Sequence, residues 1–474
     1  MYDANSVSVG GRLVNPRVEL QSSALTMFRR ILTISASVLY AISIFIAYGT
    51  YLHPEWGYIG FTYSPPSEFE SLVGLLLVIV VAAVIPSDLQ RPSAVVLLFV
   101  FALVYVPTVV VTLCLSSDAL SRYGGGLIAL MFAFILSSVV SNRSLPRRRT
   151  FGGYPSVAFI RFILFGWLFL CVFLVAVYFP IMSFANSDQI YEQRARGAAT
   201  SAVFSYSQTY FSSVFTPTIL VLGLVLRNRW LALLGVAGCI VVYMITAQRT
   251  LLGLPVVICA FYWLLSSSRS WTRYSALYIF ALALSVSLSF SFYETSETMA
   301  LVAQNLVFRT VALPGLTYSQ YFDVFTFESF TWWSHVKGLD LLVGPPSAFA
   351  SSDLWPGLGY IVGESLYRVA EWNVNANLYA SDGLAAAGEL GVVLIGIAFA
   401  LWLRALDYAS ASWNPLFCVL AVVPISISLT NGPFFTNLLS FGGIFWVMVF
   451  ALCKTQDVMP TALLSGTTSR SMIN

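Results

Sequence analysis

Three side chains in the second half of the chain, His335, Glu371 and Asp382, can accept a proton within a polar segment that separates apolar runs. Imidazole titrates near neutral pH when it is unperturbed, and a carboxylate can take a proton from a hydroxyl group. Each of the three is therefore a candidate general base. A lone histidine in a loop is also commonly a surface or hydrogen-bonding residue, so both interpretations of His335 remain open.

Four arginines are candidates for holding an anion. Arg309 lies in the same polar segment, Arg249 stands alone in a break between two apolar runs, and Arg194 and Arg196 alternate in an earlier polar stretch. Arginine stays charged and presents a planar fork of donors that matches phosphate or carboxylate oxygens in pairs. The four residues predict an anion-binding site assembled from separate loops.

These arginines also have structural interpretations. Arg249 can be a turn residue whose charged group reaches lipid headgroups. Arg194 and Arg196 can form a solvated face paired with acidic neighbours. Of the two, Arg196 is the preferred ligand, because the adjacent Gly197 suits an anion-binding turn. The acidic neighbours are Asp188 and Glu192.

Tyr318, Asn375 and Asn377 are further candidate binding residues near the three possible bases. Tyr318 belongs to an aromatic stripe with helical spacing, which also suits a helix anchored in the plane of the membrane interface. The asparagines can cap the helix that follows them. Asp382 and Glu389 are seven positions apart, so we expect them to share one face of that helix.

Composition places all these residues in a membrane protein. Of the 474 residues, 58% are hydrophobic and 9% are charged, and mean hydropathy is +0.81. A soluble domain carries about 25% charged residues. The apolar segments are continuous runs rather than alternating patterns, so they predict helices and not a barrel. With two histidines and no C-x-x-C pair, no metal site or cofactor is expected.

The predicted fold is all-α and polytopic, with about twelve transmembrane helices of about 20 residues each. The expected spans lie near 31–51, 69–86, 94–115, 126–141, 160–180, 206–226, 230–247, 250–266, 274–292, 386–403, 415–431 and 438–453. They predict a leader at 1–28, helices 1–9 within 29–292, a large loop with interfacial helices at 293–385, helices 10–12 within 386–453 and a tail at 454–474.

The arginine distribution predicts the orientation. If the amino terminus is cytoplasmic, most basic residues between spans face the cytoplasm, as the positive-inside rule requires. The tail is then also cytoplasmic and the large loop is extracytoplasmic. The basic residues on the cytoplasmic side are Arg91, Arg143, Arg147, Arg148, Arg149, Arg227, Arg229, Arg269, Arg273, Arg404 and Lys454.

Several of these segments resemble bacterial O-antigen polymerases of the Wzy type. The resemblance is carried by the Phe-Arg-Thr-Val-Ala-Leu-Pro-Gly-Leu-Thr-Tyr run that begins at Phe308 and by Asn-Ala-Asn-Leu-Tyr-Ala-Ser-Asp-Gly from Asn375. The Gln-Arg-Thr hairpin around Arg249 and the Trp-Trp-Ser-His patch that ends at His335 fit the same pattern. One large outer loop in the second half of the chain is also that family's layout.

The resemblance implies a metal-independent glycosyltransferase of the bacterial inner membrane, with a fold like that of multi-span (GT-C-like) glycosyltransferases. Such an enzyme polymerises undecaprenyl-diphosphate-linked oligosaccharide repeat units at the periplasmic face. The arginines would hold the diphosphate, and a base would activate a sugar hydroxyl. The implied partners are the lipid-linked oligosaccharide and the bilayer. A chain-length regulator is a candidate protein partner, and no nucleic acid is expected.

Two alternatives remain open. An O-antigen ligase, which transfers finished glycan to lipid A core, would share the topology and the outer arginines. A flippase or transporter would place ionisable residues at the midplane of several spans. The spans here are nearly free of charge and the polar residues gather at one face, which favours an enzyme.

Overall fold

The computed structural model describes residues 7–9, 12–14, 16–142, 152–184, 190–198, 201–457 and 459. Within them the chain is mainly helical, and the strands form only two short antiparallel pairs. These are β1 (Val7–Val9) with β2 (Arg12–Val14), and β3 (Tyr154–Pro155) with β4 (Thr455–Gln456). Parts of the predicted leader and tail lie outside the described residues, as do Arg143, Arg147, Arg148, Arg149 and Asp188.

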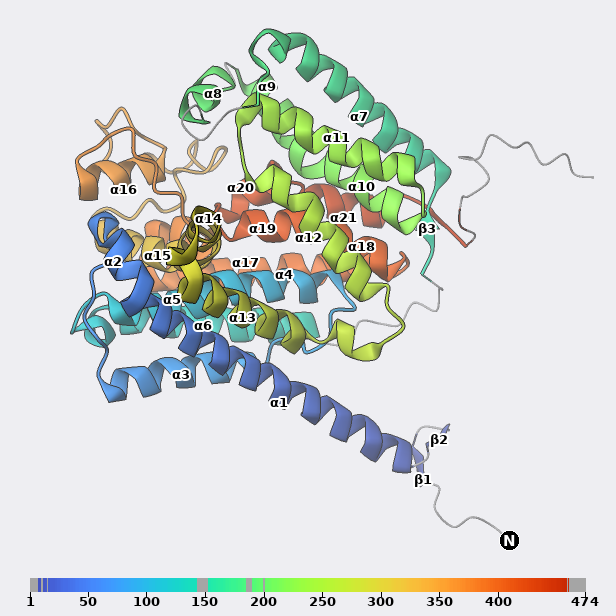
Figure 1. Cartoon of the computed structure of the whole chain (residues 1–474), viewed down its shortest axis with the longest axis horizontal. Coiled ribbons are helices and arrows are strands. Elements are labelled where there is room, and N and C mark those ends of the chain that lie inside the picture. Colours follow the sequence, from blue (N-terminus) through green and yellow to red (C-terminus); the bar gives the residue numbers. More distant parts are fainter. Residues whose placement is uncertain are drawn as a thin grey trace, which may run out of the picture.

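The helices follow one another along the whole chain (Figure 1). The α-helices are α1 (Pro16–Ala47), α2 (His53–Trp56), α3 (Glu68–Ala82), α4 (Pro92–Val100), α5 (Val106–Cys114), α6 (Ala119–Asn142), α7 (Val157–Tyr178), α8 (Ile190–Arg196), α9 (Ala202–Tyr210), α10 (Thr216–Val225), α11 (Arg229–Thr246), α12 (Thr250–Leu265), α13 (Ser275–Phe292), α14 (Glu297–Ala303), α15 (Leu313–Val324), α16 (Leu358–Tyr367), α17 (Ala385–Ser410), α18 (Pro415–Ala421), α19 (Val423–Leu429), α20 (Phe434–Leu439) and α21 (Gly443–Leu452). The π-helical segments are η1 (Tyr48–Leu52), η3 (Phe101–Tyr105), η6 (Phe211–Phe215), η9 (Gln304–Ala312) and η10 (Tyr379–Leu384).

In the described part of the chain, ten helical stretches are long and apolar enough to cross a membrane. The chain is therefore a multi-pass membrane protein, and the predicted all-α membrane fold is confirmed at that level. All but one of the ten overlap an expected span. They are Ala24–Ile59, Pro92–Cys114, Ala119–Asn142, Val157–Ile181, Ala202–Val225, Arg229–Thr246, Ser275–Thr295, Glu297–Val324, Tyr379–Ser410 and Phe434–Leu452.

The remaining expected spans are helical but shorter. Those near 250–266 and 415–431 correspond to Thr250–Leu265 and Pro415–Leu429. The one near 69–86 corresponds to α3, whose first turn is closed by a capping box between Ser67 and Glu70.

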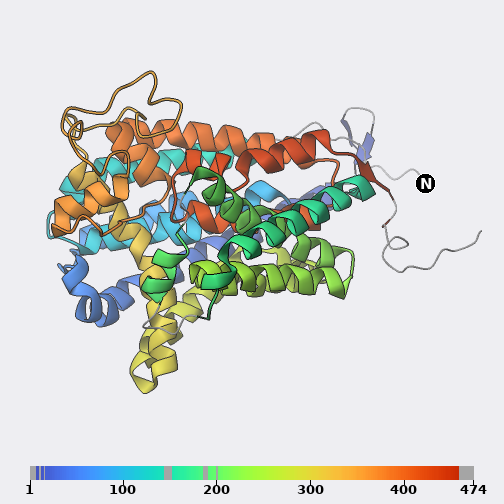
Figure 2. The same ribbon diagram turned by 90° about the horizontal axis from the view of Figure 1, so that it is seen from above.

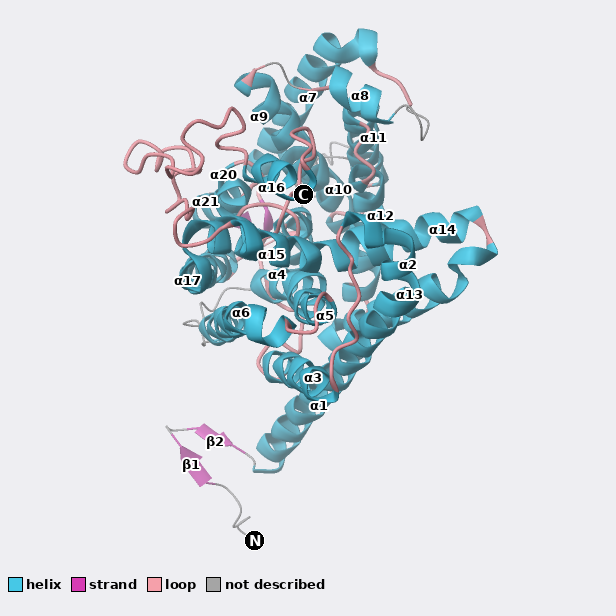
Figure 3. Ribbon diagram, turned by 90° about the vertical axis from the view of Figure 1, so that its left-hand side faces the viewer, coloured by secondary structure: helices cyan, strands magenta, loops and turns pink. Residues whose placement is uncertain are grey.

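The additional stretch, Glu297–Val324, lies where the sequence predicted loop. In Figure 3 most long helices are seen nearly end-on, whereas α14 runs across the view, and in Figure 2 the same yellow segment leaves the bundle sideways. Further along, a Cβ on Gly315 would lie 2.7 Å from the carbonyl oxygen of Pro107, so this stretch packs closely against α5. We infer that α14 projects from the side of the bundle and that α15 packs among its helices.

The π-helical segments have an identifiable cause. Four of them are each followed by an α-helix with proline at its second position, namely Pro54, Pro107, Pro217 and Pro314. Proline has no N–H and its ring clashes with the carbonyl one turn earlier, so the preceding turn widens. The segment η10 has no such proline, and it contains Asp382.

One end of the bundle, which we call the basic end, gathers the segments that the arginine count assigns to the cytoplasm. The amide of Leu89 donates to Arg273 O, Gly153 N donates to Ser412 O, and β3 pairs with β4. Beside them, Asp407 accepts hydrogen bonds from Ser93 N and Oγ at 3.0 and 2.6 Å and so caps α4.

The opposite end, which we call the loop end, gathers the segments predicted to be extracytoplasmic. Ser64 N donates to Cys114 O, and the Tyr367 hydroxyl donates to Ile59 O at 2.6 Å. The segment around α16 forms a lobe at this end, away from the N-terminal β-strands (Figure 1). The predicted outer segments therefore assemble into one surface.

Candidate functional site

At the loop end, His335 and Asp382 form a buried pair. The Nε2 of His335 lies 3.0 Å from Oδ1 of Asp382, and the two side chains are 6% and 0% exposed. The other ring nitrogen, Nδ1, lies 2.8 Å from Oγ1 of Thr331. Two of the three candidate bases, 47 positions apart, are thus brought together.

Two further hydrogen bonds, one from a backbone amide and one from an indole side chain, position Asp382. Its Oδ2 accepts a hydrogen bond of 2.9 Å from the amide of Phe435 at the start of α20. Its carbonyl accepts one of 2.9 Å from the indole of Trp333. Both carboxylate oxygens are therefore occupied, as a buried carboxylate requires.

The segment that leads to His335 is hydrogen-bonded to the start of α17, the helix that follows Asp382. Thr331 N donates to Ala385 O and Trp332 N donates to Ala386 O. Trp332 and Trp333 have φ values of 45° and 63°, in the left-handed region that bulky side chains rarely adopt. Two adjacent strained residues beside a buried ionisable pair are typical of functional sites, where strain concentrates.

Asp382 and Glu389 do not share a helical face, so that prediction is wrong. Asp382 lies in the widened turn η10, and the helix is then broken at Ala387 and Gly388, which has φ 59° and ψ −140°. Glu389 is exposed beyond the break, beside Gly125 of α6, where an added Cβ would lie 2.6 Å from its Oε1. Of the two carboxylates, only that of Asp382 is buried inside the protein.

Arg194 lies beside the turn that carries Arg249. Its Nη2 donates to the carbonyl of Ala247 at 3.4 Å, and Ala247 ends α11. Arg249 is half-buried at the start of α12, where its carbonyl accepts from Leu252 N. These contacts bring Arg194 to the turn that carries Arg249.

Gln193 anchors α8 through hydrogen bonds of its side chain. Its amide nitrogen donates to Ile181 O at 2.9 Å and to Met244 O at 2.7 Å, while its oxygen accepts from Ser183. The side chain is 3% exposed. Gln193 thus fastens α8 to the carboxyl end of α11 and orients the arginine that follows it.

The preference for Arg196 over Arg194 is not supported by the geometry. Arg196 is exposed and ion-paired with Glu192 one helical turn earlier, which is the solvated face of the alternative interpretation. The adjacent Gly197 is needed for packing, because a Cβ there would lie 2.0 Å from Ile245 O. The glycine therefore reflects a close approach of α8 to α11 rather than an anion-binding turn.

A series of contacts connects these arginines to the buried pair. Gln208 of α9 donates to Gly197 O at 3.1 Å, and Tyr210 at the end of α9 donates to Leu439 O at 2.6 Å. Leu439 is the last residue of α20. Phe435, whose amide donates to Asp382, is the second residue of the same helix. The two groups therefore share one framework of packed elements.

The remaining predicted residues fall into two classes. Arg309 on η9, Asn375 and Glu371 are exposed. Tyr318 and Asn377 are fully buried. The Tyr318 hydroxyl donates to Gly126 O at 2.9 Å, and the Asn377 oxygen caps η10 through Tyr379 N and Ala380 N. The contacts of Tyr318 and Asn377 are those of structural residues, and Glu371 does not join the His335–Asp382 pair.

Three residues that matter here were not singled out from the sequence. Thr331 binds His335, Phe435 donates its amide to Asp382, and Gln193 positions Arg194. The Asn-Gly-Pro break before α20 signals a chain reversal near Phe435. No local pattern identifies Thr331 or Gln193, because their partners are set by tertiary packing.

Chemically, the His335–Asp382 pair suits proton transfer. A carboxylate that accepts from His335 Nε2–H leaves Nδ1 as the proton acceptor of the ring. Among the described residues, no group of three or more His, Cys, Asp and Glu side chains is placed to hold a metal ion. Comparisons of the chain with protein-family models, curated proteins and solved structures found no match.

Proposed function

We propose that this protein is a membrane glycosyltransferase that polymerises lipid-linked oligosaccharide repeat units. The observation that carries the proposal is the buried His335–Asp382 pair, held at the junction of the large loop and a membrane helix beside two strained tryptophans. The undecaprenyl-diphosphate carrier, the bacterial inner membrane and the periplasmic orientation are taken from the resemblance to Wzy-type polymerases. We include them in the proposal.

In the proposed reaction, the acceptor sugar hydroxyl takes the position that the Thr331 hydroxyl holds near Nδ1 of His335. The imidazole accepts the hydroxyl proton while Asp382 keeps Nε2–H oriented and stabilises the imidazolium that forms. The hydroxyl oxygen bonds to the anomeric carbon of the donor glycan. The bond to the lipid diphosphate breaks, and the diphosphate leaves with the electron pair.

In this proposal the arginines stabilise the diphosphate leaving group. Negative charge grows on the diphosphate as it leaves, and fixed guanidinium groups stabilise that charge. Arg194 and Arg249 are the best placed, because Arg194 on α8 donates to Ala247 in the turn that carries Arg249. Arg309 remains a candidate for the same role, since it is exposed on η9, next to Phe308, which stacks on Trp56 with ring centroids 4.0 Å apart.

Gene deletion in the source organism tests the proposal. The surface polysaccharide is resolved on a gel before and after deletion. We expect the long-chain ladder to disappear while a single repeat unit stays attached to the core. Loss of all attached glycan would indicate a ligase or flippase, and an unchanged ladder would refute a polymerase.

Complementation then tests the site. His335→Gln and Arg249→Gln should fail to restore the ladder although protein is present in the membrane at the wild-type level. The matched control is His53→Gln, because His53 is the chain's other histidine, is exposed, and has its Nδ1 2.9 Å from Phe61 O. A normal ladder with His335→Gln would remove His335 from the mechanism.

A further inference from the structure

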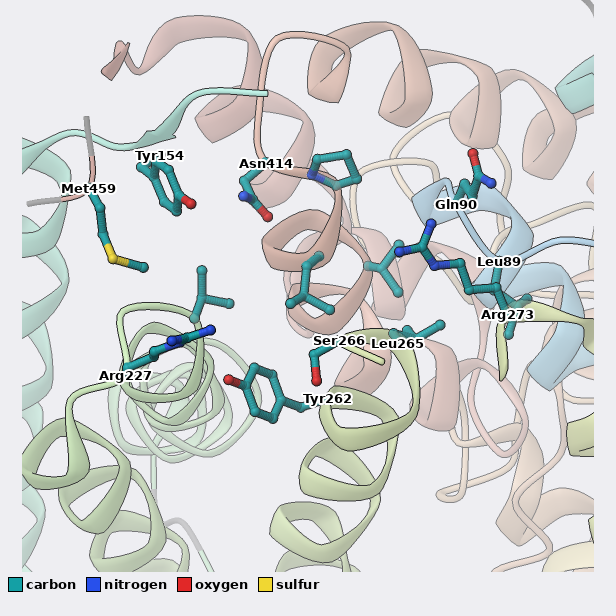
Figure 4. Close-up of a pocket in the computed structure, with 14 residues that line it drawn as sticks. Leu89, Gln90, Tyr154, Arg227, Tyr262, Leu265, Ser266, Arg273, Asn414 and Met459 are labelled. Atoms are coloured by element: carbon teal, nitrogen blue, oxygen red, sulfur yellow. The ribbon is translucent and has the colours of Figure 1, made fainter. Parts of the chain in front are cut away.

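A cavity of about 660 Å³ opens at the basic end, opposite the loop end that carries the His335–Asp382 pair. Figure 4 shows the side chains around it. Its walls come from the α10–α11 turn, the end of α12, the segment before α13 and the start of α18. The lining residues are Leu89, Gln90, Tyr154, Val225, Arg227, Tyr262, Leu265, Ser266, Arg273, Asn414, Pro415, Leu416, Val419 and Met459.

Two guanidinium groups face this cavity from opposite sides. Arg227 extends from the α10–α11 turn and Arg273 from the segment before α13 (Figure 4). Within the part of the chain that the structure describes, neither group makes a hydrogen bond or an ion pair with the protein. Two cations that share a cavity repel each other, so an anion between them would stabilise both.

Asp88, which precedes the lining residues Leu89 and Gln90, is already engaged through one carboxylate oxygen. Oδ2 of Asp88 is ion-paired with Arg29 at 2.9 Å and also accepts from Gln90. Burial raises the pKa of the Asp88 carboxyl, an effect that Arg29 and Arg273 offset only in part. Asp88 therefore leaves Arg273 available to a ligand.

The rest of the lining is divided between polar and apolar groups. Tyr154, Tyr262 and Asn414 place hydroxyl and amide groups around the space between the arginines. Leu416 and Val419, from apolar helix α18, provide hydrocarbon surface. A ligand that satisfies both parts has an anionic head and an apolar body.

We propose that this cavity binds the phosphate headgroup of an anionic phospholipid. Basic pockets between membrane helices on the cytoplasmic side are suited to such headgroups. The arginines would contact the phosphate oxygens in pairs, and the apolar wall would contact the acyl region. The site is separate from the proposed polymerase site and does not depend on that function.

A soluble phosphate shares the headgroup chemistry, so the experiment compares the two sources. The full-length protein is purified in detergent, stripped of lipid and titrated with phosphatidylglycerol, with phosphatidylcholine of the same acyl chains, and with inorganic phosphate. Bound lipid is counted by native mass spectrometry and thermal unfolding is followed in parallel. We expect phosphatidylglycerol to bind at least about tenfold more tightly than phosphatidylcholine, because the choline cation cancels the phosphate charge and is repelled by the two arginines.

Variants locate the site. Arg227→Gln and Arg273→Gln should each weaken phosphatidylglycerol binding about tenfold, whereas Arg227→Lys should weaken it less. Arg269→Gln is the matched control, because Arg269 is exposed at the same end and does not line the cavity. Unfolding temperatures show whether each variant is folded.

Three outcomes would overturn the proposal. The first is equal binding of the two lipids by the wild-type protein, and the second is binding that folded Arg227→Gln and Arg273→Gln variants retain in full. The third is stabilisation by inorganic phosphate that matches phosphatidylglycerol at equal concentration, which would assign the cavity to a soluble anion.

Discussion

At the scale of single residues, the His335–Asp382 pair makes the sharpest prediction. Asp382→Asn keeps an oxygen that can accept from Phe435 N but removes the charge that orients the imidazole. We expect this variant and His335→Gln each to lower polymerising activity by about 10²–10⁴-fold. If the pair works as a unit, the double variant should lose little more than the worse single variant. Glycan formed per amount of membrane protein measures this.

The matched control is Asp323→Asn. Asp323 is half-buried at the same end and ion-paired with Arg122 at 2.8 Å, but it lies outside the proposed site. We expect a change in activity of only a few-fold, since partly exposed ion pairs contribute about 0–1 kcal/mol.

At the scale of elements, the break at Gly388 separates the segment that carries Asp382 from the rest of α17. With φ 59° and ψ −140°, this position suits only glycine, and a Cβ would lie 2.7 Å from Cζ of Phe330. Gly388→Ala should destabilise the protein by about 1–3 kcal/mol and disturb the segment that leads to Thr331. Thermal unfolding in detergent and activity should both decrease.

Gly253→Ala in α12 is the control for that substitution. An added Cβ there has no atom within 4 Å, and the helix should gain about 0.5–1 kcal/mol. Equal unfolding temperatures for the two variants would show that the break is not required by the fold.

The same elements show how far the sequence could predict this structure. Apolar runs located most of the membrane helices, because the length and composition of a segment alone decide whether it can cross the bilayer. They could not locate the break at Gly388 or the transverse α14, since both depend on packing partners far along the chain. His335 and Asp382 were recognised separately by residue type. Their pairing, and the attachment of Arg194 through Gln193, result from tertiary contacts that no local pattern contains.

At the scale of the whole molecule, the two ends of the bundle differ in what they offer. The basic end carries Arg227 and Arg273 around a cavity, and the loop end carries the His335–Asp382 pair. The positive-inside rule assigns the basic end to the cytoplasm. Both proposals need this orientation, because a periplasmic polymerase must present its acceptor site outside and the anionic leaflet lies inside.

Cysteine labelling in intact cells tests that orientation. Leu341→Cys marks the loop end, where the side chain is 86% exposed, and Ser268→Cys marks the exposed α12–α13 turn at the basic end. Native cysteines such as exposed Cys259 set the background, which the unmodified protein measures. We expect a membrane-impermeant maleimide, once it has crossed the outer membrane, to label Leu341→Cys in intact cells. It should reach Ser268→Cys only after the inner membrane is opened. The reverse pattern would place His335 and Asp382 in the cytoplasm, where a polymerase of translocated repeat units could not use them.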